Sequence, residues 1–226
     1  MKTIRLLAFL LLPLVPMVIA QNKSFTDDLM FDSCSFASTG RNRYFILEPG
    51  YQLVLENKKG GRLVVTVLDQ TKRVGNVETR IVEENESENG KTTEVSRNFF
   101  AFCRETSSVY YFGEEVDIYK NGQIEKHEGA WTAEGPNKAG IAMPGLILVG
   151  SRYYQELAPG VAMDRAEIIS LSETRQTPAG SFKNCLKTEE SSPLELGTRE
   201  FKYYAPGIGL IQDENLSLTK YGYIKK

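Results

Sequence analysis

Residues 116–127 read VDIYKNGQIEKH, and this stretch indicates the fold class. Its centre, Asn121-Gly122, tolerates a positive φ angle at both positions of a type I′ turn, a tight connection between two antiparallel strands. The stretch therefore predicts a β-hairpin with strands over Val116–Lys120 and Gln123–His127.

Strand and turn signals continue on both sides of this hairpin, from Tyr44 onward. Short segments rich in Val, Ile, Thr, Tyr and Phe are separated by breaks such as Lys58–Gly61, Glu88–Gly90 and Pro178–Gly180, which is typical of β structure. No window has a sustained 3.6-residue apolar period, so we expect any helix to be short. The predicted fold class is mainly β and antiparallel. The clearest strand segments are Tyr51–Glu56, Arg62–Asp69, Val77–Glu83, Val95–Phe102, Val109–Phe112, Arg152–Leu157, Arg165–Leu171, Phe182–Thr188 and Arg199–Tyr204.

The chain resembles itself when it is shifted by about 100 residues. Four matches occur in the same order: Gly50 over Gly150, Arg62–Thr71 over Arg165–Thr174, Gly75–Val77 over Gly180–Phe182, and Phe99–Ala101 over Tyr203–Ala205. Chance alignment of two runs of amphipathic strands is the alternative. A true repeat predicts two similar β meanders, about 44–127 and 146–224, which bury their apolar faces against each other as one curved sheet, an open barrel or a sandwich.

The N-terminus has the form of a secretory signal. Lys2 and Arg5 precede an apolar run that ends at Ala20, and Val18 and Ala20 are the small residues of a cleavage site before Gln21. Proline interrupts this run, which is too short for a membrane span. We therefore expect a signal peptide over 1–20, a polar arm over 21–43, and a single β domain over 44–226 in an exported protein, periplasmic or extracellular.

Charge and cysteine content exclude several classes of protein. The leader carries two of the 27 basic residues and none of the 29 acidic ones, which leaves the mature chain at a net charge of −4. This balance does not indicate a nucleic-acid partner, and no mature segment is long and apolar enough to span a membrane. Three cysteines permit one internal bridge at most. The apolar run around Cys103 predicts a buried thiol there, and this leaves Cys34 and Cys185 as the candidate disulfide, or as two free thiols.

Catalytic and metal-binding signatures are absent from the sequence. His127 is the only histidine and is expected on the surface, no Gly-x-Ser-x-Gly motif occurs, and the cysteines are too far apart for a metal knuckle. We therefore predict no cofactor and no metal site. Carboxylates could act as an acid and base pair without histidine. The candidates are Glu114, Glu115, Asp117, Asp164, Glu167, Glu189 and Glu190. Along one strand, Glu115 and Asp117 share a face while Glu114 points to the other.

Aromatic residues give a modest signal for a ligand. The 11 Tyr, 11 Phe and one Trp include doublets on predicted strands, which place one ring on each face. We expect Trp131, Tyr153 and Tyr154 to contact an apolar ligand, although core packing also explains such rings. Asp164 and Arg165 follow Ala158-Pro159-Gly160 at the start of a predicted strand. This pair is interpreted as a candidate clamp for an anionic group, or as a fixed turn.

Several longer strings carry a resemblance that covers most of the mature chain. They are Val109–Glu114, His127–Trp131, Tyr153–Glu156, Ala158–Glu167 and Lys202–Leu210. They resemble segments of exported bacterial proteins that are usually called hypothetical, a family to which we can attach no activity. The pattern is more distantly similar to periplasmic carriers and sensors built as an unclosed β barrel, some of which hold lipid. The resemblance implies a bacterial envelope or extracellular setting.

These observations favour a non-enzymatic exported protein that binds an apolar molecule, such as a lipid, or a protein of the envelope. The alternative is a carboxylate-based hydrolase of cell-wall or extracellular polymer. A deep apolar cavity would support the binding protein, whereas convergent carboxylates in an open cleft would support the hydrolase.

Overall fold

The computed structural model describes residues 24–224. The predicted signal peptide and its cleavage before Gln21 lie outside these residues. Within them, the chain forms almost only antiparallel β structure, with one 3-10 turn, η1 (Phe31–Ser33), and no α-helix. The predicted fold class is confirmed. No helix in the described part of the chain is long and apolar enough to cross a membrane.

The strands range from two residues to 14. Their bounds are β1 (Phe36–Ala37), β2 (Gly40–Asn42), β3 (Phe45–Leu47), β4 (Tyr51–Glu56), β5 (Gly61–Val74), β6 (Val77–Glu88), β7 (Lys91–Cys103), β8 (Val109–Lys120), β9 (Gln123–His127), β10 (Trp131–Thr132), β11 (Lys138–Met143), β12 (Arg152–Tyr154), β13 (Glu156–Leu157), β14 (Arg165–Thr177), β15 (Gly180–Ser192), β16 (Glu195–Ala205), β17 (Gly209–Asp213) and β18 (Leu216–Tyr223).

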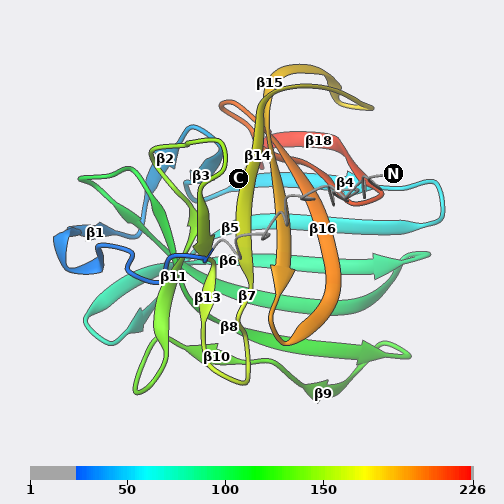
Figure 1. The fold of residues 1–226 in the computed structure, drawn as a ribbon. Coiled ribbons are helices and arrows are strands. Elements are labelled where there is room, and N and C mark those ends of the chain that lie inside the picture. Colours follow the sequence, from blue (N-terminus) through cyan, green and yellow to red (C-terminus); the bar gives the residue numbers. More distant parts are fainter. Residues whose placement is uncertain (1–23, 225–226) are drawn as a thin grey trace, which may run out of the picture.

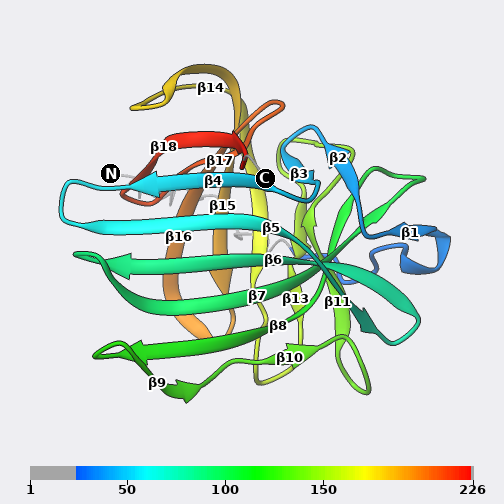
Figure 2. The same cartoon turned by 180° about the vertical axis from the view of Figure 1, so that it is seen from behind.

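One large sheet curves into a nearly closed barrel. Its strand order is β12-β14-β15-β16-β17-β18-β4-β5-β6-β7-β8-β11-β13, and β2 and β3 form a small second sheet. In Figures 1 and 2 the meander β4–β8 forms one wall, and β14–β16 cross it at a steep angle to form the opposite wall. The apolar faces of the two walls pack against each other around the interior.

The two ends of the sheet meet where β12 passes into β13. Only Gln155 separates these strands along the chain, yet β12 pairs with β14 and β13 pairs with β11. Since β12 and β13 lie in line and cannot pair with each other, one seam of the barrel stays unsealed. Gly140 permits the close approach of β11 to this crossing, because a Cβ atom on Gly140 would lie 2.0 Å from the carbonyl oxygen of Gln155.

The hairpin predicted around Asn121-Gly122 is confirmed. β8 and β9 are antiparallel partners, and Asn121 and Gly122 have φ angles of 55° and 78°, as a type I′ turn requires. The two halves of the chain also show the same local features. Gly50 and Gly150 have φ angles of 82° and 85°, and each precedes a short strand, β4 or β12. Their N–H groups donate to the carbonyls of Val67 and Ile168, which lie in the long strands β5 and β14.

The segment before β2 packs onto the outer surface of β8. Phe31 and Phe36 contact Tyr110 and Phe112 with ring centroids 5.3–6.1 Å apart, mostly edge to face. The Tyr110 hydroxyl donates a hydrogen bond to the carbonyl of Leu29. The outward rings of β8 are therefore covered by the arm of the same chain, which packs on them through Leu29, Phe31 and Phe36.

The cysteine pairing expected from the sequence is wrong. Cys34 forms a disulfide with Cys103, and Cys185 is the free, buried thiol. The reason is the pairing of β1 with β7, which places Phe36 opposite Cys103 and brings the arm to the end of β7. Cys185 lies within β15, in the opposite wall. Cys103 is fully buried, as its apolar surroundings indicated, but it is buried as half of a disulfide.

The disulfide gives a first testable prediction. Oxidised protein that is denatured and alkylated should take up one label, on Cys185, and three labels after reduction. Replacing Cys34 and Cys103 together with serine should lower the free energy of unfolding by about 4 kcal/mol, because the bridge closes a loop of roughly 70 residues. Cys185→Ala is the control. Because this variant retains the disulfide, reduction should lower its thermal stability as much as it lowers that of the wild type. Two or three labels before reduction would contradict the assignment.

Candidate functional site

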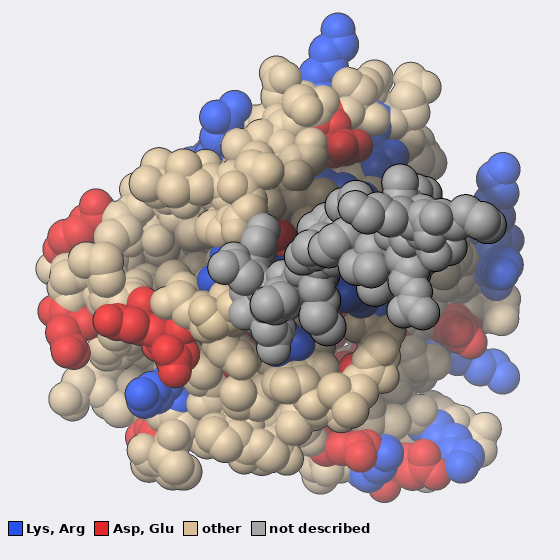
Figure 3. Space-filling view, viewed as in Figure 1, with Lys and Arg blue, Asp and Glu red and all other residues tan. Residues whose placement is uncertain are grey.

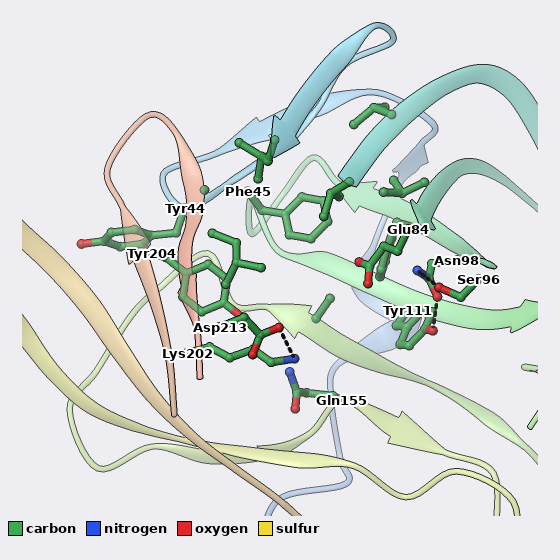
Figure 4. Close-up of a pocket in the computed structure, with 18 of the residues that line it drawn as sticks. Tyr44, Phe45, Glu84, Ser96, Asn98, Tyr111, Gln155, Lys202, Tyr204 and Asp213 are labelled. Atoms are coloured by element: carbon green, nitrogen blue, oxygen red, sulfur yellow. Dashed lines mark hydrogen bonds and ion pairs between the residues drawn. The ribbon is translucent and has the colours of Figure 1, made fainter. Parts of the chain in front are cut away.

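A cavity of about 280 Å³ lies inside the barrel between its two walls. This volume corresponds to about nine water molecules at ~30 Å³ each, and it is near the lower end of the range for small-molecule sites. The strands that line it come from both halves of the chain, as Figure 4 shows.

Apolar and aromatic groups form one part of the cavity wall. β3, β4, β5 and β6 supply most of them, and the segment 208–210 closes the same region. Phe100 and Tyr111 lie beside this part, with ring centroids 4.7 Å apart. The apolar and aromatic lining residues are Tyr44, Phe45, Ile46, Tyr51, Leu53, Val65, Val67, Val82, Phe100, Tyr111, Ala142, Tyr204, Ile208 and Leu210.

Carboxyl groups form the other part of the wall. Seven acidic residues line the cavity, and Lys202 is the one basic residue among its described lining residues. They come from β6, β7, β8, β13, β15 and β17 and from the turn before β14. The seven are Glu84, Glu94, Glu114, Glu156, Asp164, Glu190 and Asp213. We refer to these seven carboxyl groups as the acidic cluster.

Strand periodicity explains why these groups face inward. Along β7, every second residue from Glu94 to Phe100 lines the cavity, as alternation requires. A bulge in β8 changes this alternation, because Asn98 pairs with Glu114 but Phe100 pairs with Tyr111. Both Tyr111 and Glu114 therefore face the interior although three residues separate them.

Gly113 makes this bulge possible. Its φ angle is 130°, which disfavours other residues, and a Cβ atom there would lie 2.1 Å from the carbonyl oxygen of Trp131. Glu115, the residue after Glu114, points outward and forms an ion pair of 2.5 Å with Lys72. Neighbouring glutamates thus lie on opposite sides of the wall.

Lys202 is the cationic centre of the acidic cluster. Its Nζ atom lies 3.1 Å from Glu190 Oε2. It also lies 3.8 Å from Asp213 Oδ2, a contact that Figure 4 shows. Attraction to Glu190 holds the pKa of Lys202 well above its ordinary value, so the ammonium stays charged. Glu190 also accepts from Thr188 Oγ1 at 3.2 Å. This ion pair neutralises one carboxylate. The other carboxyl groups of the acidic cluster outnumber the positive charges of the lining.

The remaining carboxyl groups retain protons to an unusually high pH. Burial raises the pKa of Glu84 and of Glu114 to about 7, and it raises the pKa of Glu156 to about 8, with Asp164 and Glu114 as the nearest negative groups. The Tyr111 hydroxyl lies 2.6 Å from Asn98 Oδ1 and 3.0 Å from Glu114 Oε2. Because this hydroxyl has one hydrogen to donate, a protonated Glu114 can donate to it while it donates to Asn98.

A recess on the surface shares part of the acidic cluster. It measures about 310 Å³ and lies at the seam, between the turns that precede β14 and β16 and the end of β9. Glu114, Glu156 and Asp164 line both the recess and the interior cavity. Val161 and Leu194 form exposed apolar parts of its rim. The acidic cluster therefore forms the boundary between the interior and the seam.

The aromatic residues singled out in the sequence lie behind the cavity wall. Trp131 and Tyr153 are buried, and Trp131 packs on Tyr111 with ring centroids 5.5 Å apart. Tyr154 lies 6.0 Å from Phe25 between ring centroids. None of the three is among the described residues that line the cavity.

The structure separates Asp164 from Arg165 instead of forming a clamp. Asp164 lines the cavity, and its carbonyl accepts from the backbone N–H groups of Gln155 and Glu156. Arg165 donates to Ser191 Oγ at 3.2 Å and lies over the ring of Phe25 at 4.4 Å. The turn interpretation of this pair fits these contacts.

The other candidate residues divide between the inside and the outside of the barrel. Glu114, Asp164 and Glu190 meet in the cavity, whereas Glu115 and Glu189 form ion pairs on the outside, with Lys72 and Arg199. Asp117 and Glu167 pair with Arg97 and Arg152. His127 is on the surface, as expected, with its side chain 74% exposed and 2.6 Å from Asp117.

Sequence reasoning did not find Glu84, Glu156 and Lys202. Each occupies an inward position on a strand that looks ordinary and polar in the sequence. The signal that was available is a charged residue in phase with apolar ones, such as Glu84 after Val82 on β6.

Comparisons with protein-family models, with curated proteins and with solved structures give no match for this chain. Its function is therefore argued from the cavity and the residues that line it.

The raised pKa values predict that stability falls as pH rises. A carboxyl group whose pKa is higher in the folded state than in the unfolded chain stabilises the fold below pH 4.5, and this stabilisation is lost as pH rises towards 8. Glu156→Gln should therefore be more stable than the wild type at pH 8.5, by a few kcal/mol to order of magnitude, and similar to it near pH 4.5. Thermal denaturation between pH 4.5 and 8.5 measures the difference.

Glu115→Gln, outside the barrel, is the control and should leave the dependence of stability on pH unchanged. A wild-type stability that is flat or rises over this range would contradict the prediction.

Proposed function

We propose that this chain is a non-catalytic binding protein, exported from the cytoplasm, that holds a small amphipathic molecule inside its barrel. The observation that carries this proposal is the interior cavity, which places an apolar wall opposite a polar, acidic one. A molecule that fills such a space needs an apolar part and a polar part, because buried polar groups require partners and apolar surface favours removal from water.

Two further observations support this reading. The leader expected over 1–20 and the disulfide between Cys34 and Cys103 are both typical of proteins in oxidising compartments outside the cytoplasm. The recess at the seam beside Gln155 shares three lining residues with the cavity, so only side chains separate the interior from the surface there. The cavity combines the apolar wall that would support a binding protein with the convergent carboxyl groups that would support the hydrolase.

Filling the cavity should abolish binding. 2-Naphthol, a small neutral fluorescent amphipath, is expected to bind the mature protein saturably. Val65→Phe places a ring in the cavity and should weaken binding at least 10-fold. Val64→Phe is the matched control, because this neighbour points to the other face of β5 and should change affinity less than twofold. Equal binding by wild type and Val65→Phe, or no saturable binding by the wild type, would contradict the proposal.

A carboxylate-based hydrolase is the second candidate function. Glu114 and Glu156 retain protons near neutral pH, as a general acid must, and Asp164 lies beside them where the cavity meets the surface recess. A hydrolase of this kind would use one protonated and one ionised carboxyl group on the same glycosidic bond.

Turnover assays separate the two candidates. Wild-type protein should release no reducing ends from cell-wall glycan oligosaccharides if it is a binding protein. If it does release them, Glu156→Gln should reduce the rate at least 100-fold while Glu115→Gln does not, and this result would favour the hydrolase.

A further inference from the structure

The charge balance of the cavity is unequal. Seven carboxyl groups face Lys202 as the one described basic residue of the lining, and Lys202 already pairs with Glu190 and Asp213. Glu156 and Glu190 are buried, and taking like charges such as these out of water is costly unless they take up protons or meet positive charges. An occupant that brings a positive charge would meet this need directly.

Polar atoms close to the acidic cluster also lack partners. The buried Tyr153 hydroxyl makes no hydrogen bond, but Tyr153 lies behind the cavity wall. The Trp131 side chain hydrogen-bonds Glu114, so its indole N–H has a partner. Gln155 lines the cavity and has a buried Oε1 atom without a donor. Buried polar atoms are normally satisfied, so this acceptor favours an occupant with a donor at this end of the cavity.

The spacing of the carboxyl groups does not fit a metal ion. Among residues 24–224, the one group of three possible ligands within 4.8 Å of one another is Cys34, Cys103 and Glu105, which lies outside the cavity and includes the disulfide. A compact divalent cation needs converging oxygen ligands at about 2–2.6 Å. A larger cation with hydrogen atoms to donate suits a dispersed set of acceptors better.

We propose that the cavity selects an amphipathic primary amine, whose ammonium group lies among Glu114, Glu156 and Gln155 and whose apolar part lies against the wall formed by β3 to β6. This inference rests on the proposed function and names its ligand class. A primary ammonium has N–H donors for the carboxylates and for the orphan Gln155 Oε1, which a quaternary ammonium lacks. The rings of Phe100 and Tyr111, which lie in contact beside Glu114, add faces that attract a cation.

Binding of such a cation is coupled to proton release. Several carboxyl groups of the cavity hold protons near neutral pH, and a positive charge beside them favours their ionised forms. Affinity for the amine should therefore rise between pH 6 and pH 8.5, where the amine itself stays protonated. The titratable and charged groups that face Glu114 and Glu156 in this region are Glu84, Glu94, Tyr111, Asp164, Glu190, Lys202 and Asp213.

Isothermal titration calorimetry of the mature protein tests the inference with four ligands of one chain length: octylammonium, octyltrimethylammonium, octanol and octanoate. Octylammonium should bind at least 10-fold more tightly than octyltrimethylammonium and octanol, and octanoate should bind most weakly. Titrations in buffers of different ionisation enthalpy should show proton release with octylammonium. Calcium chloride, used as a metal probe, should not displace it.

Variants connect this selectivity to the acidic cluster. Glu114→Gln and Glu156→Gln should each weaken octylammonium binding at least 10-fold and leave octanol binding within threefold, which also shows that the variants fold. Glu115→Gln, one residue away on the outer face, should change neither. Equal affinity for the amine and octanol would overturn the amine proposal and leave the proposed function standing. Failure of all four ligands and of 2-naphthol would overturn both.

Discussion

The ion pair between Lys202 and Glu190 is the interaction on which the interior of this barrel depends. It joins β16 to β15 and places a permanent positive charge inside a wall of carboxyl groups. Without this ammonium, Glu190 and Asp213 would lose their counter-charge, and removal of one partner from a buried pair leaves a costly unpaired charge. The pair anchors the polar end of the cavity. It also fixes where the apolar end must lie, because the aromatic and aliphatic lining occupies the remaining wall.

The bulge in β8 gives the site its asymmetry. A regular strand would place Tyr111, Gly113 and Glu115 on one face, and the extra residue moves Glu114 inward in place of Glu115. On the other side of the bulge, ordinary alternation turns the rings of Tyr110 and Phe112 outward, where they meet the arm that the Cys34–Cys103 disulfide holds in place. The backbone of Gly113 approaches the carbonyl of Trp131 and has no room for a side chain.

Local chemistry explains what the sequence could predict. The Asn121-Gly122 turn, the antiparallel strands and the exposure of His127 depend on neighbours within a few residues, and the structure agrees with each. The opposite facing of Glu114 and Glu115 also follows from strand periodicity alone. The disulfide does not, because it depends on the pairing of β1 with β7 across 69 residues. The cavity depends on longer connections still, since Glu84 and Lys202 meet only when two walls of the barrel face each other.

Part of the acidic cluster reverses the usual arrangement of a protein core, since Glu156 and Glu190 are buried. Carboxyl groups are ordinarily found on the surface, and here burial raises the pKa of Glu84, Glu114 and Glu156 towards or above neutrality. Such groups weaken the fold as pH rises, and local features that conflict with stability are commonly found at functional sites. The conflict is confined to the inner wall near the seam, while the ion pairs of the outer faces, such as Glu115 with Lys72, follow the ordinary rules. On the face shown in Figure 3, acidic and basic side chains occur in small separate groups. More carboxyl groups than cations line the cavity, beside its apolar wall. A bound molecule explains this imbalance better than the stability of the fold does.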